Sequence, residues 1–293
     1  MASAPGSPSP NRLHREPRFL RISGTTNNLD LVGGKGLGLS RLMRAGLPIP
    51  PSFCVTAEAF RDALESVVHE VTDLEQLRNH LLDIELPNEL ISSIHEVVSK
   101  FGAEKWAVRS SAISEDGASM SMAGQQVTKL GIEGVDHILM AIKEVWVSLF
   151  SIDALLYRAE FDATHAVPKG IAVILQPMLD PIAAGVLFTS DTMGATDEAV
   201  CTATFGLGVG VVDGSEDATT YYIERPSGYL RRRAGEESPL TAPQLAQLAQ
   251  LSERLETLFG APQDVEWAYV EGDPLPRLVL LQMRPITAPS APE

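Results

Sequence analysis

The 293-residue chain has few cysteines, no excess of positive charge and no long uninterrupted apolar run. Its two cysteines, Cys54 and Cys201, exclude a disulfide framework and a cysteine zinc cluster, and their apolar neighbours predict small buried side chains. No apolar run reaches the roughly eighteen residues that a membrane span requires, and the first residues lack the apolar core of a signal peptide. We therefore expect a cytoplasmic protein.

Acidic residues outnumber basic ones, with 38 Asp and Glu against 23 Lys and Arg, giving a formal net charge of -15. A phosphate polymer or an anionic membrane would be repelled, so nucleic acid and lipid are not expected partners. A phosphate could bind only where several hydrogen-bond donors of the protein lie close together. The 44% of hydrophobic residues suffice for a large core, and the 21% of charged residues argue against wholesale disorder.

The pattern between two Pro- and Ser-rich tails predicts a mixed α+β chain. We expect disordered tails at residues 1–17 and 288–293, an N-terminal lobe over 18–178 and a C-terminal lobe over 179–287. The expected strands are 53–55, 106–108, 171–178, 185–189, 199–205, 264–270 and 278–286. The expected helices run from the first glycine cluster to about residue 46, then over 57–71, 88–100 and 135–161, with a last one capped by Thr241 and Pro243.

The last two predicted strands form a hairpin whose polar side chains recur with period two. Asp264 and Glu266 share one face of the first strand, and Gln282 and Arg284 share one face of the second. A hairpin symmetric about Pro274 places Glu266 opposite Gln282. The same register places Asp264 opposite Arg284, with Cβ atoms of opposed residues roughly 5 Å apart. One face of the hairpin then presents carboxylate, amide and guanidinium groups together.

These residue types suit a magnesium nucleotide. Mg²⁺ prefers oxygen ligands and often takes only one or two protein groups together with substrate phosphates. Glu266 and Gln282 are the candidate metal ligands, and the guanidinium of Arg284 can grip a phosphate. A surface ladder of ion pairs is the alternative interpretation of the same pattern.

Two further segments carry candidate phosphate donors. The cluster Gly33-Gly34-Lys35-Gly36 precedes a predicted helix, whose N-terminus can bind an anion, although its spacing is not that of a P-loop. Arg109 ends a predicted buried strand, where it stands over a long polar loop expected at residues 110–126. The alternatives are a tight turn at the glycines and a solvated loop after Arg109, each without a ligand.

Taken together, these segments resemble the nucleotide-binding domain of the pyruvate phosphate dikinase, phosphoenolpyruvate synthase and rifampin phosphotransferase family. The matching blocks occur in the family's order between about residues 30 and 287. They are Val32-Gly33-Gly34-Lys35-Gly36, Ala45-Gly46-Leu47-Pro48-Ile49-Pro50-Pro51-Ser52-Phe53, Val108-Arg109-Ser110-Ser111-Ala112, Ala123-Gly124-Gln125-Gln126, Gln176-Pro177-Met178, Ala184-Gly185-Val186-Leu187-Phe188-Thr189, Phe205-Gly206-Leu207-Gly208, Gln263-Asp264-Val265-Glu266-Trp267 and Leu281-Gln282-Met283-Arg284-Pro285-Ile286-Thr287.

The resemblance implies an ATP-grasp-type fold of two lobes, with ATP and Mg²⁺ in the cleft between them. It also implies roles residue by residue. These are phosphate binding and catalysis for Lys35, Arg109 and Arg284, a flexible loop over the phosphates for Gly124 and Thr128, an adenine-contacting hinge for Gln176 to Met178, and Mg²⁺ ligation for Glu266 and Gln282.

The chain departs from the family pattern in three respects. It has no counterpart of the mobile phosphohistidine domain, and none of its six histidines lies in a Ser- and Gly-rich turn. Thr202 and Val209 stand where the family usually has glutamates around the Gly-Leu-Gly block. Asp191-Thr192 replaces the usual Asp-Pro.

The expected function is therefore the ATP-cleaving half of a dikinase-type phosphotransferase, which passes a phosphoryl group to a histidine on a separate partner chain. Two alternatives stay open. The first is a stand-alone ATP-dependent kinase or ligase that acts on a small molecule. The second is a catalytically reduced homologue that binds nucleotide without turnover.

Overall fold

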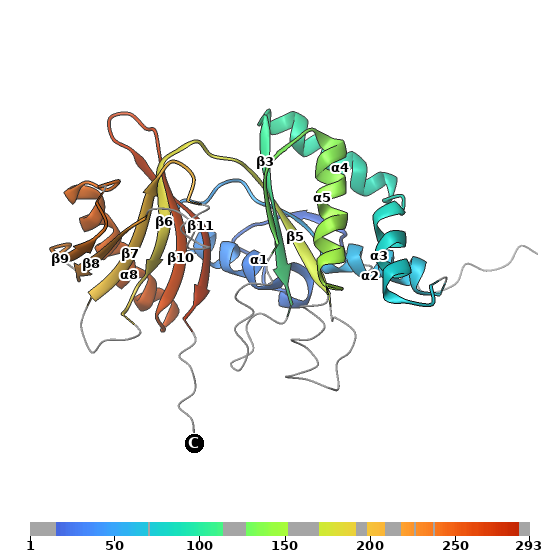
Figure 1. The fold of residues 1–293 in the computed structure, drawn as a ribbon, viewed down its shortest axis with the longest axis horizontal. Coiled ribbons are helices and arrows are strands. Elements are labelled where there is room, and N and C mark those ends of the chain that lie inside the picture. Colours follow the sequence, from blue (N-terminus) through green and yellow to red (C-terminus); the bar gives the residue numbers. More distant parts are fainter. Residues whose placement is uncertain are drawn as a thin grey trace, which may run out of the picture.

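The computed structural model describes residues 16–69, 71–113, 127–151, 170–191, 198–208, 218–225, 227–236 and 238–286. Within these ranges the chain forms two antiparallel sheets that stand side by side, with helix α1 between them (Figure 1). The predicted α+β class with two lobes is confirmed. Most of the expected N-terminal tail and all of the C-terminal tail lie outside the described residues.

The first sheet has the strand order β1-β2-β5-β3-β4. Its strands are β1 (Phe19–Arg21), β2 (Phe53–Val55), β5 (Ile171–Pro177), β3 (Lys105–Ala112) and β4 (Thr128–Glu133). Its outer side is covered by four helices, α2 (Ala57–Val68), α3 (Leu74–Asp83), α4 (Asn88–Phe101) and α5 (Val135–Ser148) (Figure 1). Their apolar faces close a core around Phe60, Trp106 and Trp146, all inaccessible to solvent.

The second sheet has the order β11-β10-β6-β7-β8-β9. Its strands are β6 (Pro181–Phe188), β7 (Glu198–Phe205), β8 (Thr219–Glu224), β9 (Leu230–Ala234), β10 (Gln263–Val270) and β11 (Arg277–Pro285). Helix α8 (Ala242–Phe259) packs its leucines on one face of this sheet, against Tyr221 and Trp267. Leu42 and Leu47 join the same core, so a segment from the N-terminal half of the chain contributes to the second lobe.

Helix α1 (Leu29–Arg44) packs against β3 and β5 of the first sheet and against β11 of the second. Its glycines make this double contact possible. Gly33 has a positive φ of 68° and kinks the helix, and a Cβ there would overlap the Ser111 carbonyl oxygen. A Cβ on Gly38 would lie 2.5 Å from the Met283 carbonyl oxygen. The glycine cluster therefore serves close packing of a helix between two sheets.

Most of the predicted elements are present. The strand at residues 53–55, the helix at 88–100, the hairpin at the C-terminal end and the start of α8 at Thr241, with Pro243 in its first turn, are confirmed. The prediction that Arg109 ends its strand is wrong, because β3 continues through Ser110 and Ser111, which are both buried. A run of small hydroxyl residues is typical of a loop, but here Ser111 packs against α1, where its hydroxyl donates to the Val32 carbonyl, and Ser110 is on the opposite face of the strand.

Other elements were missed or lie partly outside the described ranges. Helix α3 and the strands β1, β4, β8 and β9 were not predicted. Helix α5 is described to Ser148, and the rest of the long helix expected over 135–161 is followed only to residue 151. Thr56 precedes α2 as expected, but its hydroxyl donates to the Pro17 carbonyl rather than capping the helix.

Both cysteines are free and fully buried, as predicted, and burial raises the pKa of each thiol, so both stay protonated. In the part of the chain that the structure describes, no helix combines the length and hydrophobicity needed to cross a membrane.

The contact between Gly33 and Ser111 predicts a large effect of an added methyl group. Gly33→Ala should destabilise the protein by about 3 kcal/mol or more, since it combines a left-handed backbone with steric overlap. Gly46→Ala is the matched control, because Gly46 has the same φ of 68° but no atom within 4 Å of the place that its methyl group would take. It should lose only about 1 kcal/mol. Urea unfolding measures both, and equal losses would contradict the packing role.

Candidate functional site

A cavity of about 330 Å³ lies between the two sheets. Residues from both lobes line it, and most of the predicted site residues are among them. The predicted residues that line the cavity are Lys35, Arg109, Thr128, Gln176, Met178, Glu266 and Gln282. Side chains far apart in the sequence therefore meet in one place, as the sequence analysis expected of a single nucleotide cleft.

An ion pair joins the two lobes inside this cavity. The guanidinium of Arg109, on β3, donates from Nη2 to the carboxylate of Glu266, on β10. The side chains are only 12% and 17% exposed, respectively. Arg109 Nη1 also donates to the Leu281 carbonyl of β11 at 3.4 Å. The ion pair is thus shielded from water, where charged contacts are stronger than at a surface.

The hairpin register that brings Glu266 to Gln282 is the predicted one. Residues 264 and 284, and 266 and 282, are paired, whereas Trp267 lies opposite Leu280. The strands are therefore out of the symmetric register near the turn, and one extra residue, Leu281, corrects it at a β-bulge. The bulge is also where the Leu281 carbonyl receives Arg109. The predicted pairing of Glu266 with Gln282 is therefore kept by a β-bulge, which a symmetric hairpin would not contain.

Two of the predicted site residues that line the cavity carry a buried polar atom without a hydrogen-bond partner among the described residues. These atoms are Arg109 Nε, a donor, and Gln282 Oε1, an acceptor, and a third lining residue, Trp267, has an unmatched Nε1. An unmatched buried polar group costs roughly 1–3 kcal/mol, and a ligand that supplied the missing partner would offset that cost. Arg109 Nε suits a phosphate oxygen, and Gln282 Oε1 suits a hard cation or a ligand N–H.

Lys35 reaches the cavity from the helical part of α1 just after the Gly33 kink, and it is only 5% exposed. Ser111 holds this kink, because its hydroxyl donates to the Val32 carbonyl at 2.7 Å and accepts from the Gly36 N–H at 3.2 Å. The Gly36 N–H is therefore already bonded. The turn therefore places the Lys35 side chain at the cavity, while at least one of the backbone donors considered from the sequence is already used within the protein.

The opposite end of the cavity is mainly apolar. Ala107, Leu130, Pro177, Leu179 and Leu207 line it together with Gln176 and Met178. The Met178 N–H donates to the Lys105 carbonyl at 2.9 Å, and the Gln176 amide nitrogen donates to the Ser52 hydroxyl at 2.9 Å. An apolar lining beside cationic side chains is compatible with the two halves of a nucleotide.

Two predicted residues are not placed in the cavity. Arg284 is two positions beyond Gln282, does not line the cavity and is 44% exposed, with Nη2 and Nε each 2.7 Å from Asp264 Oδ2. Burial raises the pKa of Asp264, and the neighbouring Arg284 opposes that shift. Gly124 lies outside the described residues, as does Val209.

The sequence analysis did not single out several residues that shape the site. Ala107 and Ser111 flank Arg109 at a spacing of two on β3, so the same period-two pattern that was applied to the hairpin would have placed them on its face. Ser52 was noted only as part of a matching block. The contact of Leu281 with Arg109 has no sequence signal, because it depends on the bulge.

A metal would find few ligands beyond the predicted pair. The described residues contain no group of three or more His, Cys, Asp or Glu side chains that could hold a metal. Glu266 and Gln282 nevertheless fit Mg²⁺, since the orphaned Gln282 oxygen lies opposite a carboxylate in a cavity with room for phosphates.

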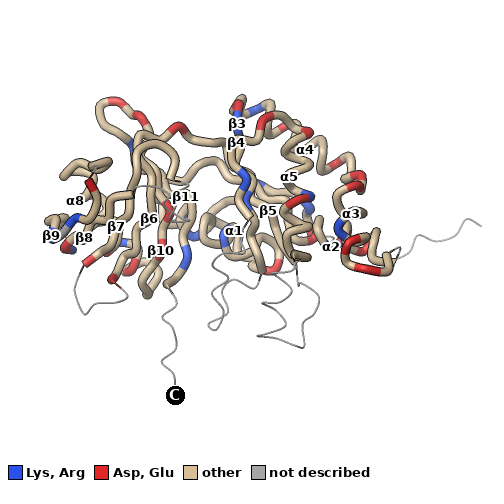
Figure 2. Tube along the Cα trace, in the orientation of Figure 1, with Lys and Arg blue, Asp and Glu red and all other residues tan. Residues whose placement is uncertain are grey.

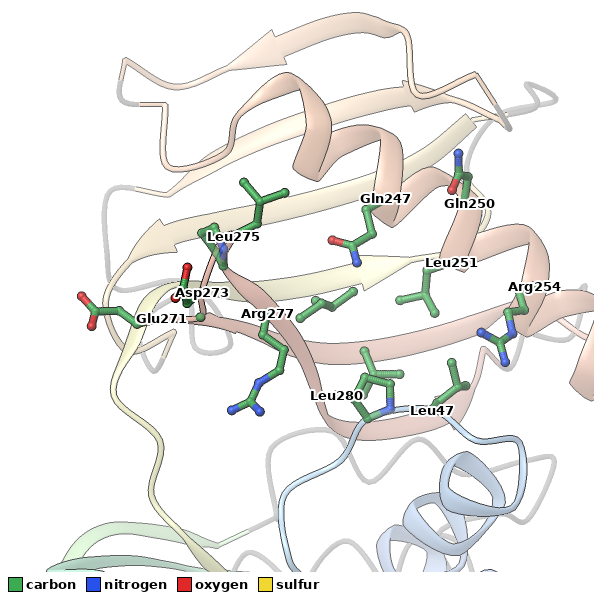
Figure 3. Close-up of a pocket in the computed structure, with 14 residues that line it drawn as sticks. Leu47, Gln247, Gln250, Leu251, Arg254, Glu271, Asp273, Leu275, Arg277 and Leu280 are labelled. Atoms are coloured by element: carbon green, nitrogen blue, oxygen red, sulfur yellow. The ribbon is translucent and has the colours of Figure 1, made fainter.

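A larger cavity, of about 750 Å³, lies away from these residues, between α8 and the hairpin (Figure 3). Leu251 and Arg254 of α8, Leu280 of β11 and Leu47 line it. None of the predicted site residues belongs to it, so size alone does not mark the functional site in this protein.

The charged residues are unevenly distributed over the fold. Figure 2 shows acidic segments over the outer helices and at the tip of the β10–β11 hairpin, and basic segments on β3 and β4 of the first sheet. Of the basic residues on these two strands, Arg109 lines the smaller cavity, whereas Lys105 and Lys129 pair with Glu133 and Glu144.

Two sheets with a cationic and oxygen-rich cavity between them define an ATP-grasp-type nucleotide-binding architecture. The family described as "Pyruvate phosphate dikinase, AMP/ATP-binding domain" matches residues 29–239 and 230–293. The chain belongs to this family, which confirms the resemblance drawn from the sequence blocks.

Relatives of known name are similar over most of this chain. The prodigiosin synthesizing transferase PigC of Serratia marcescens is 35% identical over 89% of this chain and 32% of its own length. The rifampicin phosphotransferase of Bacillus cereus is 33% identical over 88% and 34%. A probable phosphoenolpyruvate synthase of Methanothermobacter thermautotrophicus is 32% identical over 89% and 44%. The chain therefore spans less than half the length of these relatives.

Among solved structures, a dinucleotide-forming acetyl-coenzyme A synthetase 1 of Ca. Korarchaeum cryptofilum aligns with a TM-score of 0.40 and 11% identity. The alignment covers 92% of this chain and 93% of that one.

The buried position of the Arg109–Glu266 pair predicts a measurable coupling between the lobes. A double-mutant cycle of Arg109→Met and Glu266→Met should give a coupling free energy of about 1–3 kcal/mol in urea unfolding. The pair Lys105–Glu133, whose side chains are 53% and 57% exposed, is the control on the same strand β3. Its coupling should stay below about 0.5 kcal/mol. Equal coupling in the two cycles would rule out a special role for the buried pair.

Proposed function

We propose that the chain binds ATP with Mg²⁺ in the cavity between its two sheets, and that it is the ATP-cleaving component of a dikinase-type phosphotransferase. The observation that carries this proposal is the meeting of Lys35, Arg109, Glu266 and Gln282 in one cavity, with one donor and one acceptor left unmatched. Family membership supports the nucleotide.

The phosphates would occupy the end of the cavity beside Lys35 and Arg109. Both side chains are cationic and well buried, so their charges act in a medium less polar than water. Arg109 is held by Glu266 in the absence of ligand, and a phosphate would bond to its unmatched Nε. Arg284 lies two residues beyond Gln282 on β11 and would meet a phosphate only at the outer edge of the site, after leaving Asp264.

Glu266 and Gln282 would hold Mg²⁺ through one carboxylate oxygen and one amide oxygen. When bound, Mg²⁺ supplies charge neutralisation of the phosphate oxygens. The protein contributes the fixed distance between the two side chains, because the hairpin pairs them across adjacent strands.

Thr128 would lie over the phosphates at the start of β4, and Gly124 precedes it in the chain. The base would occupy the apolar part of the cavity, which Gln176 and Met178 line. Catalysis in this arrangement rests on positioning and on offsetting charge rather than on a protein nucleophile.

The transfer step would use a histidine of another chain, since none of the described residues that line the cavity is a histidine. A histidine nitrogen on a partner chain attacks a phosphorus of ATP, the bond to the oxygen of the leaving nucleotide breaks, and that oxygen keeps the electron pair. Lys35 and Arg109 would offset its charge. This chain spans 32% and 44% of the length of two of its relatives, which have room for further domains that would carry the other steps of the reaction.

One observation favours the reduced homologue as a second candidate. Thr202, at a position where the family resemblance implies a glutamate, does not line the cavity, and its hydroxyl lies 3.1 Å from the Thr220 hydroxyl. A cavity with fewer carboxylates would bind nucleotide but position the metal less firmly. This candidate retains ATP binding and lacks turnover.

Side-chain removal at the phosphate end should weaken ATP binding. Lys35→Met and Arg109→Met should each raise the Kd for Mg·ATP by about 10- to 100-fold, because a hydrogen bond to a charged group contributes roughly 1.5–3 kcal/mol. Glu266→Gln should remove the dependence of binding on Mg²⁺. Calorimetric titration measures the affinities. Lys105→Met, an exposed lysine outside the cavity, is the control and should bind ATP as the parent chain does.

Isotope exchange between ATP and labelled AMP separates the candidate functions. Exchange that requires an added histidine-bearing partner domain supports the dikinase component, and consumption of ATP with a small acceptor alone supports a stand-alone kinase or ligase. Binding without exchange under either condition supports the reduced homologue. No binding of ATP at all would refute the proposed function in every form.

A further inference from the structure

We propose that Ser52 is a positioning residue that fixes the side-chain amide of Gln176, so that the cavity selects a nucleobase carrying an exocyclic amino group. The inference rests on the proposed function, because it concerns the base end of the same cavity. It names a residue with no role assigned above and a class of base that the site prefers.

Ser52 stands next to Gln176 because of the strand register. Phe53 of β2 pairs with Leu175 of β5, so the residue before β2 lies beside the residue after Leu175. Both side chains are almost completely buried, with exposed fractions of 2% and 3%. The Ser52 backbone is held separately, since its carbonyl accepts from the Ile22 N–H at 2.9 Å. The hydroxyl can therefore be removed without releasing the segment.

The hydrogen bonds fix which way the amide points. A serine hydroxyl carries one proton, and that of Ser52 is donated to the Pro50 carbonyl at 2.9 Å. The Ser52 oxygen can then only accept, so the group that faces it from Gln176 must be a donor. That donor is Nε2, at 2.9 Å. The reverse orientation would set two oxygens against each other with no proton between them.

This orientation gives the cavity a fixed acceptor. Gln176 lines the cavity, and with its nitrogen committed to Ser52, its oxygen Oε1 is the atom left for a ligand. Ala107 is paired with Gln176 on the neighbouring strand β3 and also lines the cavity, and its short side chain leaves room beside the amide. The nearby Met178 N–H is bonded to the Lys105 carbonyl and does not compete for this role.

A fixed acceptor distinguishes bases by the group at purine C6. The amino group of adenine donates to an oxygen, whereas the C6 carbonyl of hypoxanthine would face that oxygen as a second acceptor. A buried polar mismatch of this kind is costly, so discrimination between the two should be about 10- to 100-fold in affinity. Removing the Ser52 hydroxyl frees the amide to turn and present Nε2, which would accommodate the carbonyl.

The test compares Mg·ATP with Mg·inosine triphosphate in calorimetric titrations of the full chain. The parent chain should bind ATP about 10- to 100-fold more tightly. Ser52→Ala should bring the ratio of the two Kd values towards one, mainly by improving the binding of inosine triphosphate. Ser252→Ala is the matched control, because Ser252 is a fully buried serine of α8 whose hydroxyl also donates to a backbone carbonyl, that of Ala249. It should leave the ratio unchanged.

If Ser52 had only a structural role, Ser52→Ala would not change the ratio of the Kd values for inosine triphosphate and ATP. An unchanged ratio in folded Ser52→Ala, or no discrimination by the parent chain, would overturn the inference while leaving ATP binding intact. If Ser52→Ala does not fold, Gln176→Met provides the same comparison, since it removes the acceptor at similar size, and retention of the parent ratio would refute the inference. Absence of all nucleotide binding by the parent chain would instead refute the proposed function.

Discussion

The structure depends on a charged contact between its two lobes. Arg109 of the first sheet and Glu266 of the second form an ion pair with little access to water, and the Leu281 carbonyl adds a second contact to the same guanidinium. Burying two charges is costly unless each is well matched. Here the matching is incomplete, because Arg109 Nε keeps no partner among the described residues. A site that holds its lobes together and still has unmatched polar atoms is prepared for a charged ligand.

The packing of α1 makes this contact possible. The helix lies against both sheets, and Gly33 and Gly38 allow its backbone to approach Ser111 and the Met283 carbonyl. The same approach delivers Lys35 to the cavity. Glycines that would suggest an anion-binding turn in a sequence serve here mainly for close packing, and the lysine between them is the phosphate-binding group that we propose. Family membership and this geometry point to the same ligand class by independent routes.

The C-terminal hairpin is the most predictable part of the site. Period-two alternation places Glu266 and Gln282 on one face, and antiparallel pairing places them opposite each other, because both rules depend only on local backbone geometry. Short strands such as β1 and β9 escape prediction, since a few residues carry too weak a pattern. Ser111 resembles a loop residue in the sequence because the neighbour that buries it, α1, is remote along the chain.

Periodicity and the order of short motifs are enough to establish the α+β class, the pairing of Glu266 with Gln282 and the family, because each motif and each alternation can be read from a short stretch of sequence. Three contacts of the site follow instead from the packing of the folded chain. Arg109 pairs with Glu266. Ser111 bonds to the Val32 carbonyl at the kink of α1, and Ser52 bonds to the amide of Gln176. Each contact joins residues that are far apart along the chain, and its geometry is fixed by how sheets and helices pack, which no local pattern specifies.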